Sequence, residues 1–282
     1  MRDTLPPQPY NPHYDPLIDA SPGKGLAYAP SYWCATAGPT PDHDGTLDSD
    51  KQVEVAIIGA GFTGLATAMF LAQEHNIKAV VLEANQVAWG CTSRNGGQGH
   101  LAWGRLSRSQ WIKRWGSDTA KRLHRNSLEG FEIFRALVHN PMIDCEPCGH
   151  GNLLIAHSTH ALKKLVRESE ICNQVFAYQT AILQPTEVRE KFLDDKECRG
   201  AMLEPVGIAV HPLKLAYGYM HIARTHGAEV HPSSPVVEWT QQGQYHFLRT
   251  PGGTVRANSV VIATAGYTSS QLHSLTAYRN MP

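Results

Sequence analysis

The sequence carries no excess of charge of either sign, because Lys and Arg number 25 and Asp and Glu also number 25. Nothing in the overall charge favours nucleic acid or an anionic membrane as a partner, and we expect a small-molecule partner. Hydrophobic residues make up 42% of the 282 residues, and glycines number 24. This composition is typical of an α/β globular protein, and the length allows one large domain or two.

Cysteine is scarce. The six cysteines, at positions 34, 91, 145, 148, 172 and 198, are too scattered for the disulfide framework of a small secreted domain. We therefore expect a reducing compartment, with a cytoplasmic location. Cys145 and Cys148 form the single CxxC, and the second pair or spaced histidines that zinc usually needs are missing, so we expect no metal. A redox dithiol and two structural thiols both remain as interpretations of this pair.

Two signals of secretion or membrane insertion are also missing. The N-terminus has no apolar stretch after its early Arg2, which argues against a secretory signal. The most apolar stretch, Val53–Ala72, approaches bilayer-spanning length. Its glycine spacing, and the strand pattern that restarts at Ala79, instead predict a buried strand followed by a helix. We therefore expect a soluble protein with no integral membrane span.

A glycine-rich motif, Gly59-Ala60-Gly61-Phe62-Thr63-Gly64, lies between the strand-like run Val53–Ile58 and the helix-like run Leu65–Gln73. Gly59 permits a tight turn, Gly61 lets the backbone approach a pyrophosphate, and Gly64 lets the helix pack close to the sheet. The first helical turn, which includes Phe62 and Thr63, offers N–H groups and the positive end of the helix dipole to phosphates.

Glu83 closes the next strand-like run, Ala79–Leu82, and completes a βαβ nucleotide-binding unit. A carboxylate about twenty residues beyond the glycines accepts hydrogen bonds from an adenosine ribose. It also repels a 2′-phosphate, which argues against NADP. A glycine-rich turn that binds nothing is the alternative interpretation.

The rest of the chain divides into an arm and a series of elements. Residues 1–50 are rich in Pro, Asp, Gly and Tyr, which predicts an extended arm with an aromatic anchor at Ser31-Tyr32-Trp33. Residues 89–100 form a polar, glycine-rich segment that a bound cofactor would order. Helices are predicted over 117–139, 158–178, 185–192 and 213–226, strands over 151–156, 207–210, 229–230, 235–239, 245–248 and 259–266, and a hairpin turn over 251–255.

Four segments together point to a known family: Ser31-Tyr32-Trp33, the glycine motif with Glu83, Ser93-Arg94-Asn95-Gly96-Gly97-Gln98, and Ala263-Thr264-Ala265-Gly266. They resemble the D-amino-acid oxidase superfamily of FAD-dependent oxidoreductases, in the branch related to gamma-glutamylputrescine oxidoreductase. Where that branch has Gly-Ala-Ser-Gly-Arg-Asn, this chain has Cys91 and Ser93 at the second and fourth positions. Both departures are small in volume.

The resemblance implies a set of FAD-binding residues. Gly59, Gly61 and Gly64 would line the pyrophosphate, with Glu83 on the AMP ribose and Ala84 beside it. Ser93, Arg94, Asn95, Gly96, Gly97 and Gln98 would run from the pyrophosphate toward the flavin ring. Val236, in a strand following a helix, would meet the adenine through its backbone, and Thr264, Ala265 and Gly266 would close over the cofactor. Arg94 would either clamp phosphate or supply positive charge near the ring.

The resemblance also implies a fold and an activity. The fold is α/β, with a Rossmann-like FAD-binding domain of the glutathione-reductase type at residues 51–145 and 205–282 and an inserted α+β substrate-binding domain at 146–204. Family members continue further than this chain, so we expect an N-terminal fragment whose substrate domain is incomplete.

The implied activity is oxidation of the C–N bond of an amine or amino acid of the gamma-glutamylputrescine kind. Hydride would pass to flavin N5, water would hydrolyse the imine, and electrons would reach oxygen or another acceptor. A truncated, non-catalytic nucleotide-binding remnant and an NAD-dependent dehydrogenase are the alternatives. The sequence identifies no catalytic base.

Overall fold

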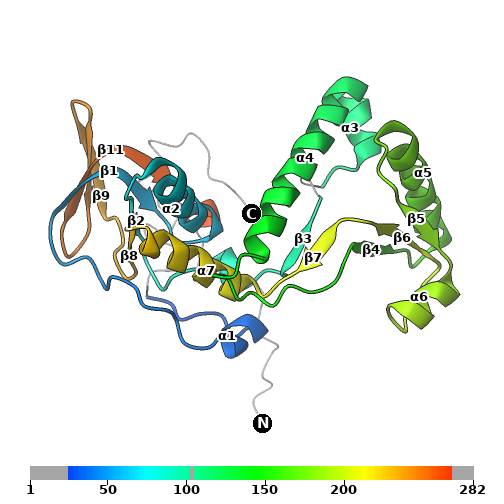
Figure 1. Ribbon diagram of the computed structural model, residues 1–282, viewed down its shortest axis with the longest axis horizontal. Helices are drawn as coiled ribbons and strands as arrows, with labels where there is room; N and C mark the ends of the chain where they lie inside the picture. The colour runs from blue at the N-terminus through cyan, green and yellow to red at the C-terminus, as the bar shows by residue number, and fades with distance from the viewer. Residues whose placement is uncertain (1–24, 102–104, 269–282) are drawn as a thin grey trace, which may run out of the picture. The chain divides into compact units, whose positions relative to one another are not determined.

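A computed structural model describes residues 25–101 and 105–268, which form two compact units (Figure 1). The first unit holds the described residues up to Gly96, the short stretch Met142–Cys145 and the residues from Pro212 onward. The second unit holds Gly97–Pro141 and Glu146–His211. The first half of the predicted arm lies outside the described residues.

The first unit is built on a six-stranded sheet in the order β8-β2-β1-β11-β10-β9. Its strands are β1 (Lys51–Ile58), β2 (Val80–Leu82), β8 (Glu229–His231), β9 (Glu238–Gln242), β10 (Tyr245–Arg249) and β11 (Thr254–Ile262). Four neighbouring strands, β8, β2, β1 and β11, run parallel, whereas β10 is antiparallel to both β11 and β9. The sequence predicted β1, β2 and the β10–β11 hairpin, and the structure confirms them.

Two helices of the first unit, α2 (Phe62–His75) and α7 (Pro212–Thr225), pack against each other and against the parallel strands. Ile57 points toward this helical layer, because its Cγ2 lies 3.3 Å from the position of a Cβ on Gly64. The neighbouring residues Ala56 and Ile58 belong to a core cluster that includes the fully buried Leu47. Since successive side chains of a strand point to opposite faces, Leu47 brings the arm to the face opposite α2.

The described residues of the second unit form two small antiparallel sheets and four helices. One sheet pairs β3 (Gln98–His100) with β7 (Gly207–Ala209), and the other has the order β4-β6-β5. Its strands are β4 (Asn152–Ile155), β5 (Ala181–Leu183) and β6 (Ala201–Glu204), and the helices are α3 (Arg108–Trp115), α4 (Ser117–Val138), α5 (Thr159–Val175) and α6 (Pro185–Lys191).

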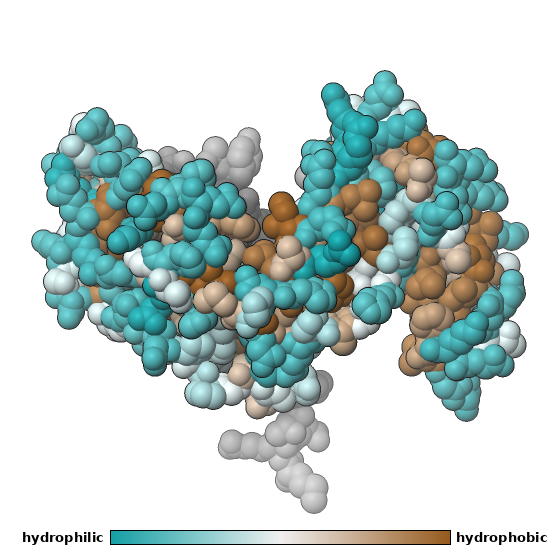
Figure 2. All heavy atoms as spheres, viewed as in Figure 1, coloured by the Kyte–Doolittle hydropathy of each residue, from teal (hydrophilic) through white to brown (hydrophobic). Residues whose placement is uncertain are grey.

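Apolar side chains are visible on the surface of the second unit (Figure 2), over the part that holds β5, β6 and α6. Phe192 and Leu193 directly follow α6 and are 49% and 54% exposed. Among residues 25–101 and 105–268, no helix is both long and apolar enough to cross a bilayer.

The unit boundary differs from the predicted domain boundary at residues 97–141 and at residues 205–211, which both belong to the second unit. Residues 97–141 were expected with the glycine motif, but they fall in the second unit with residues 146–211. The reason is local packing: α3 contacts α4 and α5, and α4 contacts β3. A Cβ on Gly99 of β3 would lie 2.2 Å from the Phe134 ring of α4, so this helix packs closely on the strand.

Candidate functional site

The glycine motif forms a sharp turn between β1 and α2. Gly59 has a φ of +105°, and a Cβ there would lie 2.5 Å from the carbonyl oxygen of Ala263, at the end of β11. Its N–H donates to the carbonyl of Leu82, at the end of β2, at 2.8 Å. Only glycine fits this position. The turn therefore lies at the carboxyl ends of three parallel strands, which is where open α/β sheets bind ligands.

The other two glycines bring α2 close to this turn. A Cβ on Gly64 would lie 1.9 Å from the carbonyl oxygen of Gly59. Gly61 is the N-cap of α2 and has no side chain to cap the helix, while the N–H of Phe62 donates to the hydroxyl of Thr92 at 3.1 Å. Thr63 is exposed in the first turn. The positive end of a 14-residue helix thus lies beside backbone without side chains, which favours a bound phosphate.

Glu83 lies directly at the glycine turn. One carboxylate oxygen accepts the N–H of Ala60 at 2.8 Å, and the other accepts the N–H of Asn85 at 2.9 Å. Burial raises the pKa of the Glu83 carboxyl, and hydrogen bonds from these amides and that of Ala84 act in the opposite direction. A carboxylate has about four acceptor positions, so ribose hydroxyls can still donate to it.

The loop that follows β2 is tied to the start of α2. It contains a short 3₁₀ turn, η1 (Cys91–Ser93), whose Thr92 hydroxyl accepts the Phe62 amide. The buried Ser93 hydroxyl donates to the Trp89 carbonyl at 3.0 Å, and the Asn95 side chain donates to the Thr92 carbonyl at 3.0 Å. These bonds hold Ser93 and Asn95 next to the glycine turn, and Gly96 ends the first of the three segments that form the first unit.

The predicted aromatic anchor of the arm binds this same loop. Ser31, the N-cap of the short helix α1 (Tyr32–Thr36), donates its hydroxyl to the Ser93 carbonyl at 3.0 Å. The indole N–H of Trp33 donates to the Asn95 carbonyl at 2.6 Å, whereas the Tyr32 side chain is 67% exposed. The indole N–H of Trp89 donates to the Ala27 carbonyl at 2.8 Å. The arm is therefore part of the candidate site's framework.

Arg94 binds within its own loop. Its Nε donates to the Gly90 carbonyl at 3.1 Å, and its Nη2 donates to the Trp89 carbonyl at 2.7 Å. The guanidinium carbon lies 4.7 Å from the centre of the Trp89 ring, within range of a cation–π interaction. Arg94 thus places a positive charge on the loop while closing it.

The end of β11 meets the same region from the other side of β1. The Ala263 N–H donates to the Ile58 carbonyl at 2.8 Å, and a 3₁₀ turn, η2 (Ala265–Tyr267), follows. The Tyr267 ring packs edge-on against Trp89 with centroids 5.2 Å apart. Thr264, Ala265 and Gly266 therefore lie at the same edge of the sheet as the glycine turn.

Val236 was predicted inside a strand, and this prediction was wrong. Residues 235–237 precede β9, which begins at Glu238, because its partner β10 ends at Arg249, opposite Glu238, and turns away after it. The N–H of Ser234 donates to the Glu83 carbonyl at 2.7 Å and that of Ser233 to the Asn85 carbonyl at 2.8 Å. These bonds still bring the segment before Val236 alongside Glu83.

A cavity of about 580 Å³ opens beside Ala84. It is lined by the arm residues Gly25, Leu26, Ala27 and Tyr28 and by Ala84, Asn85, Gln86, Ser233, Pro235 and Pro251. Its position next to Glu83 leaves room for a group attached to a ribose there.

The last two residues of the predicted set, Gly97 and Gln98, belong to the second unit. Gln98 is an exposed residue of β3, paired with Ala209 of β7. Gly97 is buried, and its carbonyl accepts the N–H of Val210 at 2.8 Å. The other fifteen residues of the predicted set lie in the first unit.

Sequence reasoning did not assign a role to Thr92, Trp89 or Tyr267. The Thr92 hydroxyl joins the loop to α2, and the Trp89–Tyr267 contact joins the loop to the end of β11. No spacing in the sequence indicates these contacts, because the partners are 30 and 178 residues apart in number. Only the adjacency of Tyr267 to the predicted Gly266 offered a signal.

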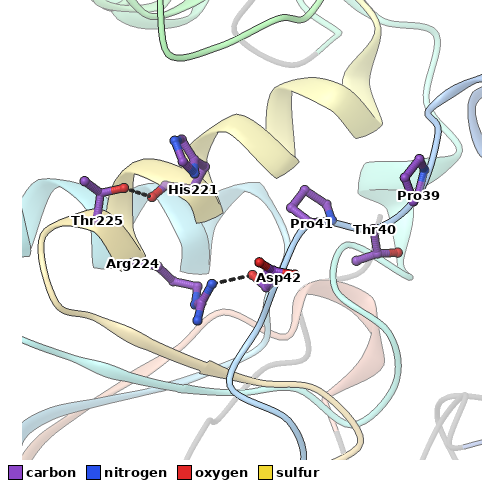
Figure 3. A pocket seen from close by; sticks show the side chains of 7 residues that line it. All are labelled: Pro39, Thr40, Pro41, Asp42, His221, Arg224 and Thr225. Atoms are coloured by element: carbon purple, nitrogen blue, oxygen red, sulfur yellow. Dashed lines mark hydrogen bonds between the residues drawn. The ribbon is translucent and has the colours of Figure 1, made fainter.

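The arm is also held at its far end, where it lines a cavity of about 690 Å³ with α7 (Figure 3). Arg224 of α7 donates two hydrogen bonds to the Asp44 carboxylate, each 2.9 Å, and a third to the Asp42 carbonyl. Asp44 also accepts the Val230 N–H at 2.7 Å. His221 and Thr225 lie on the same helix at the cavity wall.

Comparisons with known proteins agree with this geometry. Residues 54–281 match the family model described as FAD dependent oxidoreductase. Gamma-glutamylputrescine oxidoreductase of Escherichia coli K12 is 32% identical over 252 residues, which cover 89% of this chain and 58% of that enzyme. Sarcosine oxidase subunit beta of an Arthrobacter species is 28% identical over 78% of this chain and 52% of that subunit.

The fold is found in a solved structure as well. Glycine oxidase of Geobacillus kaustophilus superimposes with a TM-score of 0.67 at 23% identity, covering 79% of this chain and 58% of that one. The βαβ unit, its glycine turn and Glu83 define a dinucleotide-binding protein. This chain belongs to the family of FAD-dependent oxidoreductases. It spans somewhat more than half the length of the Escherichia coli and Arthrobacter relatives.

Proposed function

We propose that this chain binds FAD with its pyrophosphate at the Gly59–Gly64 turn and its AMP ribose at Glu83. The observation that carries the proposal is the Glu83 carboxylate, held by the Ala60 amide directly beside the N-terminus of α2. A ribose at Glu83 would have its phosphates at the positive end of that helix. The cavity beside Ala84 and the nearby Val236 segment would receive the adenine.

The remaining FAD contacts follow the chain away from this turn. We assign Ser93, Asn95 and Gly96 to the pyrophosphate side, because the Thr92–Phe62 hydrogen bond holds their loop at α2. Thr264, Ala265 and Gly266 would close over the cofactor from the end of β11. Gly97 and Gln98 continue toward the flavin ring. Arg94 would hold the loop closed and contribute positive charge to it.

We further propose that the whole protein oxidises the C–N bond of an amine or amino acid. Bound FAD would supply the hydride-accepting chemistry, and water would hydrolyse the resulting imine. The protein's part is to bind and orient the cofactor and to exclude competing reactions. Oxygen or another acceptor would take the electrons, and a reducing compartment such as the cytoplasm would suit the cysteines.

The finer proposal for the substrate is a gamma-glutamylated amine such as gamma-glutamylputrescine. Its support is the 32% identity to the Escherichia coli enzyme of that name. Sarcosine, a secondary amine, is the competing substrate, supported by the similarity to the sarcosine oxidase subunit.

The binding proposal is tested by adding FAD to the purified chain and recording its spectrum. Bound flavin should give absorption at about 450 nm that stays with the protein on gel filtration. Glu83→Gln should weaken FAD binding about tenfold, because it removes a charged acceptor for the ribose. The matched control is Glu74→Gln, an exposed residue of the same βαβ unit. A chain that takes up no FAD, or a Glu83→Gln variant that binds as tightly as the wild type, would contradict the proposal.

Turnover is tested separately with the FAD-loaded chain. Hydrogen peroxide release and dye reduction should be measured with gamma-glutamylputrescine, sarcosine and glycine. Turnover of the first compound alone supports the finer proposal, and a preference for sarcosine overturns it. Binding of FAD without turnover of any amine would restrict this chain to a binding role.

A further inference from the structure

The second unit contains a cavity of about 620 Å³ whose lining includes no residue of the proposed FAD set. It lies among α3, α5, the strands β4 and β6 and the residues that follow β3. Its volume is within the range of small-molecule sites. Part of its wall is apolar, through Leu101, Leu106, Leu154, Leu165, Ile171 and Met202.

The charged lining residues are predominantly positive: Arg105, Arg108, Lys164 and Arg167 against Glu168 and Glu204. The Glu204 carboxylate is already satisfied, because it accepts from Arg108 Nη1 at 2.8 Å and from the Asn152 side chain at 2.9 Å. Glu168 accepts the N–H of Ser109 at 3.2 Å. The cavity therefore retains an excess of positive charge, which favours an anion.

Two buried donors of the lining have no hydrogen-bond partner among the described residues. They are Arg108 Nη2 and Trp111 Nε1. Arg108 is only 6% exposed and Trp111 only 2% exposed. Residues three apart lie on the same face of a helix, so both belong to one face of α3. Arginine and the indole of tryptophan can only donate. Buried polar groups are normally paired, and an acceptor that reached these two donors would complete their hydrogen bonding.

A neighbouring histidine adds a third donor. Arg108 Nε donates to His124 Nδ1 at 3.4 Å, so Nδ1 carries no proton and Nε2 does. His124 Nε2 is also buried without a partner among residues 25–101 and 105–268. Of the four buried side-chain atoms without a partner among the described residues, these three are donors, and the fourth, the Tyr178 hydroxyl beside Arg108, can donate or accept.

We propose that this cavity binds a small organic carboxylate. The carboxylate would accept hydrogen bonds from Arg108 and Trp111, and its apolar body would lie against Leu154 and Leu165. This goes beyond the proposed function, because it requires neither FAD nor an amine. A carboxylate fits better than an inorganic anion, since the apolar wall would remain unfilled by phosphate.

The test is calorimetric titration of the full chain with hexanoate. Hexan-1-ol and hexylamine provide the same apolar body without the anion, and inorganic phosphate provides an anion without the body. Hexanoate should bind with one site per chain, and the other three should not. Equal binding of hexan-1-ol and hexanoate would show that the negative charge plays no role. Binding of phosphate but not of hexanoate would overturn the proposal that the ligand is an organic carboxylate.

Trp111→Phe is the informative variant, because it keeps the ring and leaves the Arg108–Glu204 pair intact while removing one donor. It should weaken hexanoate binding about tenfold. Trp115→Phe, at the 44% exposed end of the same helix, is the matched control and should bind as the wild type does. Equal binding by Trp111→Phe and the wild type would contradict the proposal.

A second variant guards against a folding defect. Arg108→Lys keeps a charge for Glu204 but loses the planar fork of donors, and it should also weaken hexanoate binding. Its control is Arg114→Lys, because the Arg114 guanidinium lies over the Trp115 ring at the end of α3. Circular dichroism should show that each variant is folded. FAD binding is measured by absorption and hexanoate binding by calorimetry. Failure of the FAD proposal can therefore be distinguished from failure of the carboxylate proposal.

Discussion

At the scale of single residues, the absence of a Cβ at Gly59 allows the strands around the candidate site to meet. A side chain there would collide with the Ala263 carbonyl, and the backbone φ of +105° is unfavourable for any residue with a Cβ. The same turn brings the Ala60 amide to Glu83. The glycine is therefore required by the joining of β1, β2 and β11 as well as by any bound pyrophosphate.

His124 provides a residue-scale prediction about pH. Burial, followed by the charge of Arg108, lowers the pKa of His124 to about 4, and the aromatic rings of Phe176 and Tyr178 complete its surroundings. The unfolded chain, with an ordinary histidine pKa, binds a proton at higher pH than the folded chain does. Stability should therefore be fully present above about pH 6.5 and decrease as the pH falls toward 4.

The measurement is the urea unfolding midpoint between pH 7 and pH 5, with His124→Gln for comparison. Glutamine keeps an oxygen that accepts from Arg108 but does not titrate, so the variant should lose less stability over this interval. Between pH 7 and pH 5, the unfolding free energy of the variant should fall by up to about 2 kcal/mol less than that of the wild type. Parallel curves for variant and wild type would show that His124 is not the group responsible.

At the scale of elements, two helical glycines should respond to alanine in opposite directions. Gly130 is exposed in the middle of α4, and a Cβ there would meet nothing within 4 Å. Gly130→Ala should stabilise the protein by roughly 0.5–1 kcal/mol through the higher helix propensity of alanine. In α7, a Cβ on Gly218 would lie 2.8 Å from the Ile143 side chain, so Gly218→Ala should destabilise by roughly 1–3 kcal/mol.

Urea denaturation of both variants tests this pair. Each serves as the control for the other, since the chemical change is identical and only the surroundings differ. Two changes of the same sign would refute the assignment of Gly218 to a packing role.

The elements with a clear period were predictable from sequence. The apolar run before the glycine motif indicated β1, and the spacing of Leu123, Leu128 and Phe131 indicated α4. By contrast, α3 has the sequence RSQWIKRW, with two buried residues, and was missed because so short a segment shows no period. The short strands β3, β5 and β6 were also missed, since pairing with distant partners rather than local pattern defines them.

The candidate site was predictable to a similar degree. The glycine turn and Glu83 could be identified because each has a local sequence context. The contacts of Thr92, Ser31 and Trp33 could not, because they join segments more than twenty-five residues apart. Val236 was misplaced because β9 begins only opposite the end of its partner β10, and the apolar run carries no signal of where that partner ends.

At the scale of the whole chain, the arm links the candidate site to α7 and β8. Burial tends to raise the pKa of Asp44, but hydrogen bonds from Arg224 and from the Val230 amide lower it overall. The Asp44 carboxylate should therefore stabilise the attachment above about pH 4 and lose this effect below it.

Asp44→Asn should weaken the attachment of the arm to α7 by about 0.5–1 kcal/mol. The effect is small because the Asp44 and Arg224 side chains are 25% and 27% exposed. Limited proteolysis with mass spectrometry should detect faster cleavage within residues 25–50. Asp48→Asn is the control, because within residues 25–101 and 105–268 the Asp48 carboxylate accepts a side-chain hydrogen bond only from the adjacent Ser49 hydroxyl. Equal cleavage of the two variants would argue against the Arg224–Asp44 attachment.

The pairing of β1 with β11 also determines when the protein can fold during its synthesis. Lys51 pairs with Val255 and Ile58 with Ile262. About 200 further residues must therefore be synthesised before β1 can pair with β11. A chain emerging from the ribosome exposes that edge of β1 until β11 follows. Ala263 approaches Gly59 only once β11 is in place, so uptake of FAD at the proposed site would follow the synthesis of β11.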